Sequence, residues 1–523
     1  MNNKRLDIIF VVELLLIGLV ILGFLPRDVV LYWTIVLAIY VLVVPLEESI
    51  LFFVRSIPLF IAIPITSGFD SLNIWRILST LIFLKWLWHK RILQTYLSLG
   101  KSFFRQPLQF VKNHQLLITL KLLVFLALLS VLIAPDKVLS IKRIVYFINL
   151  SLLGVVIHDL VILDNSFLKR LIKNISIPVI VVLLAGFAQL ISTYFTDIYQ
   201  FADFWTLTAE KNLFGTQWAS ISRQANTWFA YFGDQLSLRM FSLFPDSHSF
   251  PIFLLLGLPS LFAISVRKII DRNETLKSMW RIRGSILVVF VPLAFLAAIL
   301  SGTRGIWAAS LGAVLVVFWL LIWFKKHGVG DKHRNTFKYI SCYLFLFFLL
   351  FSVAYPIIAS PQFLVSKGDS LLLEHRLRSV LDFGETSNKE RIRIWKLSAL
   401  SIIKHPLLGV GIGNFPVVLN QDLSLAKAGS TAHNLYLHIA AEMGIPALIL
   451  SLVFLWLLLK KTYRNFIDSS DSLEMIYFGA MLIFLPWVLI YSLTDPAIFD
   501  ERAFLLFVMS CTLIFGTKKH PRE

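Results

Sequence analysis

The chain has 523 residues, of which 57% are apolar and 15% are charged, and its formal net charge at pH 7 is +18. Many separate runs of about eighteen or more apolar residues predict a polytopic α-helical membrane protein. They exclude an outer-membrane barrel, which would show short alternating strands, because in lipid only a helix satisfies every backbone group within one segment. Cys342 and Cys511 both fall within predicted spans, so no disulfide framework is expected.

We predict an all-α fold with about 14 transmembrane helices (12–14). The predicted spans lie near residues 8–25, 29–46, 50–66, 73–88, 116–134, 141–163, 175–195, 250–266, 284–300, 304–324, 338–358, 433–459, 474–494 and 501–516. They divide the chain into N-terminal helices (1–195), a first long loop (196–249), middle helices (250–358), a large, partly helical loop (359–432) and C-terminal helices (433–523). The first run continues directly into further spans, so it is expected to be a retained helix and not a cleaved signal.

Lysine and arginine are distributed unevenly between alternate loops. With the N-terminus in the cytoplasm, the inner loops hold most of them, and the short outer loops hold only Arg27, Lys137 and Arg304. This asymmetry predicts that both termini are cytoplasmic and that both long loops lie outside the cytoplasmic membrane. The positive charge therefore mostly reflects topology and faces anionic lipid headgroups, and it lacks the compact basic domain of a nucleic-acid-binding protein.

Three side chains stand near the outer ends of predicted spans. Arg239 lies shortly before one span, Arg304 opens a second and His433 opens a third. All three spans run from outside to inside, so each presents a helix N-terminus, with unpaired N–H groups and partial positive charge, to the outer face. The pattern predicts an electropositive pocket for a phosphate or pyrophosphate on a lipid.

The large loop contains a predicted helix. A serine at 387 followed by a glutamate three residues later has the pattern of a capping box, and Pro406 ends the helix. Arg391 and Trp395 are one turn apart on it, so they share a face. The helix either lies on the membrane surface with its arginine snorkelling or presents Arg391 to a substrate, and the sequence leaves both open.

Three glycines, Gly409, Gly411 and Gly413, follow this helix. A G-x-G-x-G pattern outside a strand–turn–helix unit is weak evidence for a nucleotide site, so we favour a tight turn with positive φ over direct phosphate contact. The turn is expected to help place Asn414 and His433.

Glu442 is the carboxylate nearest to His433 along the predicted span. A separation of nine residues places it on the opposite side of a regular helix and roughly 13 Å deeper, so the two are not expected to form a dyad. An intramembrane carboxylate marks a functional site by default, but we interpret Glu442 as pairing with another helix.

Several motifs together resemble the O-antigen ligase and O-antigen polymerase family over about residues 239–450. They are Arg391-Ile-Arg-Ile-Trp395, Pro406-Leu-Leu-Gly-Val-Gly-Ile-Gly-Asn-Phe415, His433-Asn-Leu-Tyr-Leu-His-Ile-Ala-Ala-Glu442-Met-Gly444, Ser301-Gly-Thr-Arg304-Gly305 and the segment from Arg239 to His248. Members of this family are polytopic glycosyltransferases with the C-type membrane architecture. They act on undecaprenyl-pyrophosphate-linked glycans at the outer face of the cytoplasmic membrane, in cell-surface polysaccharide and lipopolysaccharide biosynthesis.

The resemblance implies metal-independent, inverting transfer of such a glycan, without a cofactor, to a hydroxyl of a lipid, glycan or protein acceptor. It makes His433 the candidate base, and it makes Arg304, Arg391 and, more weakly, Arg239 the candidate pyrophosphate ligands. The candidate supporting residues are Asn434, Trp395 and Glu442. The chain departs from the family pattern where Gly302-Thr303 separates Ser301 from Arg304 and where Ala447 replaces a frequent glycine.

The chemistry of these residue types agrees with that implication. A sugar hydroxyl is a poor nucleophile, and a positioned histidine can take its proton as the bond to C1 forms. Arginine forks match diphosphate oxygens and stabilise the charge that grows as the diphosphate leaves. The predicted outer loops contain no Asp-x-Asp pair or His/Cys cluster, so no metal site is expected.

Two alternatives remain. A polymerase that joins repeat units uses the same donor as a ligase, so the sequence does not separate them. A secondary transporter would place polar groups and broken helices near the middle of the membrane, usually in repeated halves, and no such repeat is found.

Overall fold

The computed structural model describes residues 4–64, 72–89, 115–216, 218–220, 227–232, 235–271, 287–360, 362–363, 386–421 and 430–518. The long helices are α1 (Lys4–Ile21), α2 (Val29–Val43), α3 (Leu46–Ser56), α4 (Ile74–His89), α7 (Gln115–Ile133), α8 (Lys137–Leu163), α9 (Asn165–Ser192), α13 (Ser249–Asp271), α14 (Leu287–Leu300), α15 (Arg304–Lys326), α16 (Asp331–Ala359), α18 (Thr386–Lys404), α19 (Leu435–Asp468), α20 (Ser472–Tyr491) and α21 (Glu501–Gly516). The short ones are η1 (Ile57–Leu59), α10 (Ile198–Asp203), η2 (Phe204–Glu210), α11 (Lys211–Phe214), η4 (Phe415–Leu419) and η5 (Ala497–Phe499). The strands β1 (Phe229–Phe232) and β2 (Gln235–Leu238) pair antiparallel, with Phe229 opposite Leu238.

The helices confirm a polytopic α-helical membrane protein. Among the described residues, eight helices are long and apolar enough to cross a membrane: α7, α8, α9, α13, α15, α16, α19 and α20. Every predicted span overlaps a helix, but α2 and α14 are shorter apolar helices, and the count of fourteen stays a prediction.

The span predicted at 50–66 is wrong in its second half. Helix α3 ends at Ser56, the three-residue turn η1 contains Pro58, and Ala62 then pairs with Asn73 as an isolated bridge. Proline cannot supply the backbone N–H that a continuing helix needs, but α9, α13 and α20 continue through an internal proline, so Pro58 alone does not account for the end of α3.

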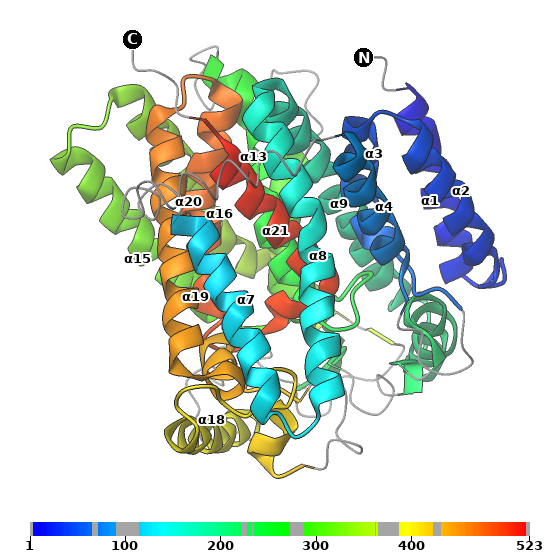
Figure 1. The fold of residues 1–523 in the computed structure, drawn as a ribbon. Coiled ribbons are helices and arrows are strands. Elements are labelled where there is room, and N and C mark those ends of the chain that lie inside the picture. The colour runs from blue at the N-terminus through cyan, green and yellow to red at the C-terminus, as the bar shows by residue number, and fades with distance from the viewer. Residues whose placement is uncertain are drawn as a thin grey trace.

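Helices α13 and α20 form the centre of the bundle (Figure 1). In each of them, 94% of the most apolar stretch is buried, as expected for helices that are apolar all round. Small residues allow close approach: a Cβ at Gly257 of α13 would lie 2.1 Å from Cγ2 of Val179 on α9. Around this pair pack α9, α14, α15, α16, α19 and α21. The N-terminal helices α1 to α4 lie at one side, where α3 packs against α9 and α4 packs against α8.

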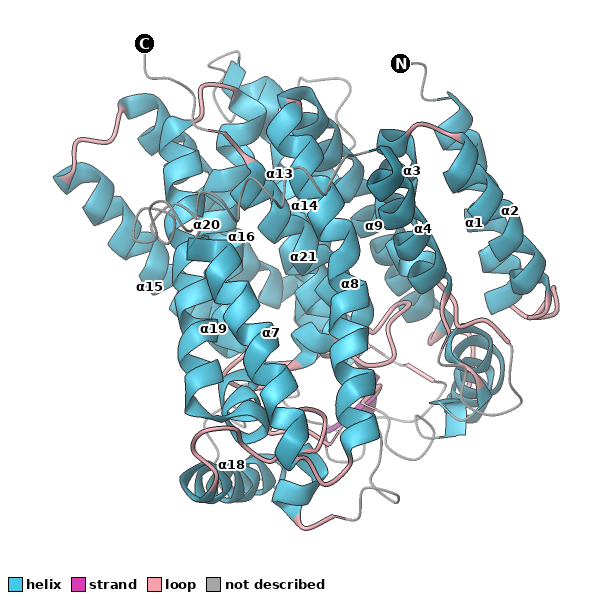
Figure 2. Ribbon diagram, viewed as in Figure 1, coloured by secondary structure: helices cyan, strands magenta, loops and turns pink. Residues whose placement is uncertain are grey.

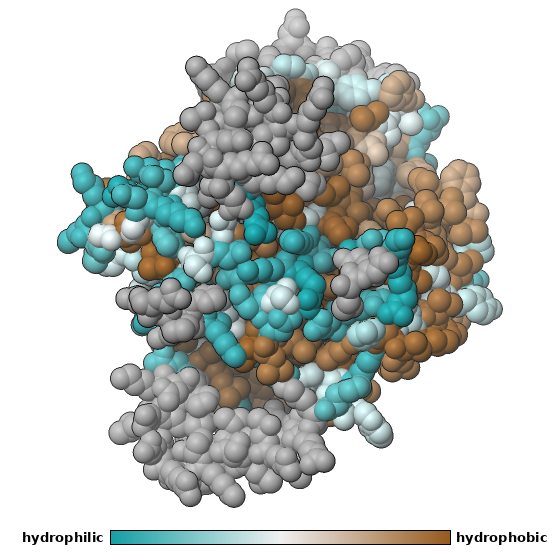
Figure 3. Space-filling view, turned by 90° about the horizontal axis from the view of Figure 1, so that it is seen from above, coloured by the Kyte–Doolittle hydropathy of each residue, from teal (hydrophilic) through white to brown (hydrophobic). Residues whose placement is uncertain are grey.

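The two ends of the bundle differ. Helix α18 and the strand pair lie at one end, called here the α18 end, whereas α1 begins and α21 ends at the opposite end, called the terminal end (Figures 1 and 2). Hydrophilic residues gather at the centre of the terminal end, and apolar residues cover much of its flank (Figure 3). Ion pairs there join Asp471 to Lys169 at 2.8 Å and to Arg267 at 3.7 Å.

Candidate active site

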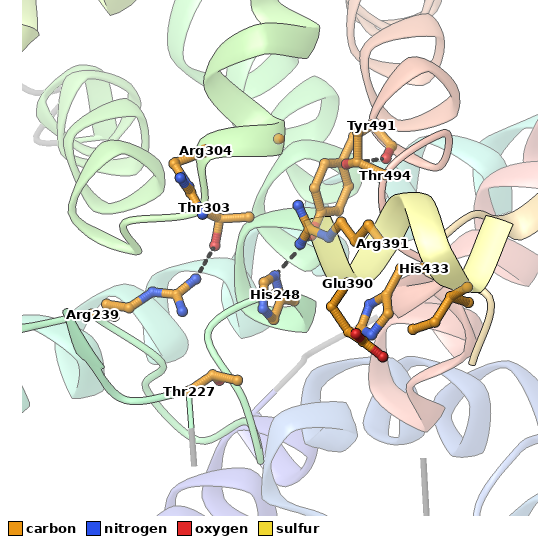
Figure 4. Close-up of a pocket in the computed structure, with 12 residues that line it drawn as sticks. Thr227, Arg239, His248, Thr303, Arg304, Glu390, Arg391, His433, Tyr491 and Thr494 are labelled. Atoms are coloured by element: carbon orange, nitrogen blue, oxygen red, sulfur yellow. Dashed lines mark hydrogen bonds between the residues drawn. The ribbon is translucent and has the colours of Figure 1, made fainter. Parts of the chain in front are cut away.

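One cavity of about 320 Å³ lies at the α18 end, where segments far apart in the chain meet. Its lining residues are Thr227, Arg239, His248, Thr303, Arg304, Gly305, Glu390, Arg391, Ile394, His433, Tyr491 and Thr494 (Figure 4). The structure therefore brings together the candidate base and the three candidate pyrophosphate ligands, which are His433, Arg239, Arg304 and Arg391.

Arg239 is held where strand β2 ends. Its backbone N–H donates to the Trp228 carbonyl at 2.7 Å, and its side chain donates to the Ser301 carbonyl at 3.3 Å and to Oγ1 of Thr303 at 3.5 Å. Gly302 has a φ of +63°, and a Cβ there would lie 3.0 Å from Cγ of Arg239. The Gly302-Thr303 pair, a departure from the family pattern, thus makes room for Arg239 and contributes to its binding.

Arg304 is the first residue of α15, so the N-terminus of this helix faces the cavity. Oγ1 of Thr303 donates to the Ser247 carbonyl at 2.7 Å and ties the start of α15 to the segment before α13. At Gly305, a Cβ would lie 2.4 Å from Oγ1 of Thr494, so only glycine lets α15 approach the end of α20 this closely. The unpaired N–H groups and partial positive charge of the helix start add to the arginine charge.

Arg391 reaches the cavity from α18. The helix begins at Thr386, one residue before the predicted cap, and ends at Lys404, shortly before Pro406 as predicted. Ile394, one turn after Arg391, is buried against the glycine loop, whereas Ile403 near the helix end is 74% exposed. One side of α18 therefore docks on the protein with Arg391 at the cavity; Trp395 is not among the cavity-lining residues.

The prediction that His433 opens α19 is wrong, because the helix begins at Leu435. His433 precedes the helix in a left-handed conformation with φ +45°, and Asn434 is the cap, accepting hydrogen bonds from the N–H groups of Tyr436 at 2.9 Å and Leu437 at 3.0 Å. Nδ1 of His433 lies 3.3 Å from Oδ2 of Asp495. A strained non-glycine conformation of this kind persists only where neighbouring contacts enforce it, and here it coincides with the cavity.

Asp495 was missed by the sequence reasoning. It lies in the turn after α20 and is 8% exposed. Burial by itself would raise its pKa, but His433 and Arg391 nearby hold the pKa of this carboxyl below its ordinary value. The sequence pattern that predicts the pocket is positive charge near helix ends, which an aspartate does not match, although an aspartate directly after a predicted span on the same face is a usable signal.

His248 and Tyr491 were also missed as site residues. Nδ1 of His248 lies 3.2 Å from the Tyr491 hydroxyl, and both side chains line the cavity. Burial, together with the nearby Arg239, Arg391 and His433, lowers the pKa of His248 to about 3 in spite of the nearby Asp495. This imidazole is therefore neutral at physiological pH. His248 ends the quoted segment that begins at Arg239, but its spacing in that segment does not indicate a role in the site.

The glycine loop forms a tight turn, as predicted. Gly409, Gly411 and Gly413 have φ values of +65°, +95° and +81°. A Cβ at Gly409 would lie 2.4 Å from the Ala441 carbonyl oxygen. No glycine of this loop is among the cavity-lining residues. The loop supports the site indirectly, because it packs against Ile394 of α18.

Helix α19 is interrupted where this loop packs on it. Gly444 has a φ of +84°, and the break frees the Ala441 and Glu442 carbonyls, which accept from the N–H groups of Val410 and Gly411 at 2.9 Å each. Buried donors and acceptors left by a broken helix need such partners. The loop and the break therefore fit each other.

Asn414 and Glu442 fix the loop and do not line the cavity. The Asn414 side chain accepts from the Asp136 N–H at 3.0 Å and donates to Oγ of Ser140 at 2.8 Å. The carboxylate of Glu442 accepts from the Phe415 N–H at 3.2 Å. Glu442 also lies 3.5 Å from Nε2 of His438 on its own helix. Its bond to Phe415 joins α19 to the start of η4, in line with the interpretation that Glu442 pairs with another helix.

The fold and the site define a multi-pass membrane protein with an electropositive cavity at one end of its helices. Residues 289–452 match the family model described as O-antigen ligase, and no curated protein matches the chain. This region of the chain is therefore similar to the O-antigen ligase family. The match includes Arg304, Arg391 and His433, whereas Arg239, His248 and Asp495 lie outside it.

Proposed function

We propose that the protein is a membrane glycosyltransferase. It transfers a glycan from an undecaprenyl-pyrophosphate-linked donor to an acceptor hydroxyl at the outer face of the cytoplasmic membrane. The observation that carries this proposal is the convergence of three arginines and His433 on one cavity at the α18 end, with Asp495 behind the histidine at 3.3 Å from its Nδ1. A donor diphosphate supplies the negative charge that such a cavity attracts.

The arginines bind the donor diphosphate in this proposal. They come from three separate elements, and the start of α15 adds its unpaired N–H groups. Arg391 makes no hydrogen bond with the described residues, so its planar guanidinium is available for bidentate contact with phosphate oxygens. The same positive charges stabilise the diphosphate as it leaves, so the transfer is metal-independent.

His433 is the base. Asp495 accepts from Nδ1–H and fixes the tautomer, which leaves the lone pair of Nε2 to take the acceptor's proton. The acceptor oxygen bonds to C1 of the donor sugar as the bond between C1 and the phosphate oxygen breaks. The proton goes to His433 and the electron pair goes to the diphosphate. Attack from the side opposite the leaving group inverts the configuration at C1.

The location of the cavity supports the orientation. Basic residues that are predicted to be cytoplasmic, such as Lys169, Arg267 and Lys325, belong to segments at the terminal end, opposite α18. We therefore place both termini in the cytoplasm and the cavity outside. In intact cells carrying the Cys342→Ser background, Lys396→Cys on α18 should react with a membrane-impermeant thiol reagent and Lys332→Cys should not. Labelling of Lys332→Cys but not of Lys396→Cys would place the cavity in the cytoplasm and contradict the proposed mechanism.

The activity is tested with the purified full chain in proteoliposomes that contain a defined undecaprenyl-pyrophosphate glycan and an acceptor. We expect glycan transfer with release of undecaprenyl pyrophosphate, and we expect His433→Ala to reduce it by about two to four orders of magnitude. Transfer onto a second donor glycan identifies a repeat-unit polymerase, and transfer onto a lipid or protein identifies a ligase. Solute uptake without consumption of the donor would contradict the proposal.

A further inference from the structure

His248 occupies a defined place in the cavity that the mechanism above leaves unused. Figure 4 shows it between Arg239 on one side and His433 on the other. Its pKa responds to Asp495, Arg239, Arg391 and His433, so all four charged or titratable groups are near it. It is thus the histidine that lies between the proposed diphosphate site and the proposed base.

The backbone around His248 is firmly held. The Asp246 carboxylate accepts from the N–H groups of His248 and Ser249 at 2.8 Å each, which caps the start of α13. Oγ of Ser247 donates to the Thr227 carbonyl at 3.1 Å. These contacts give the imidazole a fixed starting point, as a group that must orient a substrate requires.

Tyr491 fixes the tautomer of His248. The phenol is 1% exposed, and within the described part of the chain its one hydrogen-bond partner is Nδ1 of His248 at 3.2 Å. A buried hydroxyl without a partner costs free energy, so the phenol donates to Nδ1. The proton of the neutral ring is then on Nε2, and His248 carries an N–H donor that no described residue uses.

We propose that His248 is a further substrate-contacting residue of this reaction, and that its neutral Nε2–H donates a hydrogen bond to the oxygen joining the donor sugar to the diphosphate. Tyr491 is the positioning residue. The inference rests on the proposed glycosyl transfer. In an in-line displacement, C1 and the leaving oxygen lie between the bound diphosphate and the attacking hydroxyl, and this is where His248 stands.

The role of His248 is distinct from that of His433. His433 receives the acceptor's proton, whereas His248 keeps its own and only stabilises the charge that develops on the leaving oxygen. A preorganised neutral donor aimed at developing charge acts in the transition state more than in the bound donor. Loss of His248 should therefore lower kcat and leave the KM for the donor nearly unchanged.

Amide substitutions test this geometry in the full chain. The amide nitrogen of His248→Gln reaches the region of Nε2, whereas that of His248→Asn reaches only the region of Nδ1. We expect His248→Ala and His248→Asn to lower kcat by about 10- to 100-fold and His248→Gln to stay within about 5-fold of wild type. His327→Gln, at an exposed histidine beyond the far end of α15, is the matched control.

Two further measurements separate the possible roles. The pH profile of kcat should be the same in His248→Gln and wild type, and Tyr491→Phe should lower kcat without changing the donor KM. Wild-type kcat in His248→Ala would overturn the inference, as would a His248→Gln variant that is as impaired as alanine and has lost one limb of the pH profile. If His248→Ala does not fold, the comparison of the Gln and Asn variants decides. Failure of wild type to consume the lipid-linked donor would instead refute the proposed function.

Discussion

Replacement of Asp495 by asparagine is the sharpest test of the proposed base. The change keeps the size of the side chain and removes its charge, so the imidazolium that forms on His433 during transfer loses its counter-charge. Asparagine can also offer its amide N–H to Nδ1, which would favour the wrong tautomer of the ring. The structure predicts a loss of kcat without a loss of fold.

The magnitude follows from the geometry of the pair. At 3.3 Å, an effective dielectric constant of about 20 to 40 gives an attraction of about 2.5 to 5 kcal/mol between unit charges. The His433 side chain is 39% exposed, so solvent screening favours the lower part of that range. An expected loss of about 2 to 3 kcal/mol corresponds to a decrease in kcat of roughly 30- to 160-fold.

The assay is steady-state glycan transfer in proteoliposomes, with donor binding measured separately on the same preparation. Donor affinity should change little, because the arginines that bind the diphosphate remain. Asp495→Glu, which restores the charge on a longer side chain, is the matched variant and should recover part of the activity. A wild-type kcat in Asp495→Asn would refute the pairing, and a loss of donor binding with kcat intact would assign Asp495 to the donor site.

Three other substitutions have defined outcomes. Arg304→Lys keeps the charge but loses the planar fork, so transfer should fall about 10- to 100-fold at normal protein level, and near-normal turnover would remove Arg304 from the site. Gly409→Ala places a Cβ 2.4 Å from a backbone oxygen at a residue with a φ of +65°. The free energy of unfolding should fall by about 2 to 4 kcal/mol, measured by thermal unfolding, and an unchanged Tm would contradict the described packing. Burial, with Asp246 and Glu501 nearby, raises the pKa of Asp500 to about 7. Between about pH 4 and 7 the folded chain therefore keeps a proton on this carboxyl that the unfolded chain has released. The folded state loses stability as the pH rises through this range. Asp500→Asn, which can still cap α21, should therefore raise the Tm at pH 8 and have little effect below pH 4, and an equal gain at both pH values would show that the charge is not the cause.

The amino-acid sequence by itself determined the helices and their order. Long apolar runs must satisfy their backbone groups internally, so the periodicity and length of each run were enough to predict a helix. Proline and glycine marked most interruptions, including the positive-φ turn at 409–413. The exception at 50–66 contains Pro58, but other apolar runs stay helical through an internal proline, so residue type alone did not decide where this helix ends.

Tertiary structure alone decided which helix ends meet. Because successive spans cross in opposite directions, Arg239, Arg304 and His433 are predicted on the same side of the membrane. No local sequence pattern indicates that α13, α15 and α19 are neighbours there. That choice depends on the packing of α20 against α13, α15 and α19, which brings Tyr491 at the end of α20 to the cavity and Asp495 in the following turn to His433.

The pairing of His433 also required the three-dimensional arrangement. Helical geometry correctly separated His433 from Glu442, but it assumed that the histidine lies within the helix. His433 instead stands outside α19 with φ +45°, and it meets a carboxylate 62 residues later in the chain. Side-chain chemistry can be predicted from sequence because residue types limit it, whereas a contact between two helix ends depends on how the whole bundle packs.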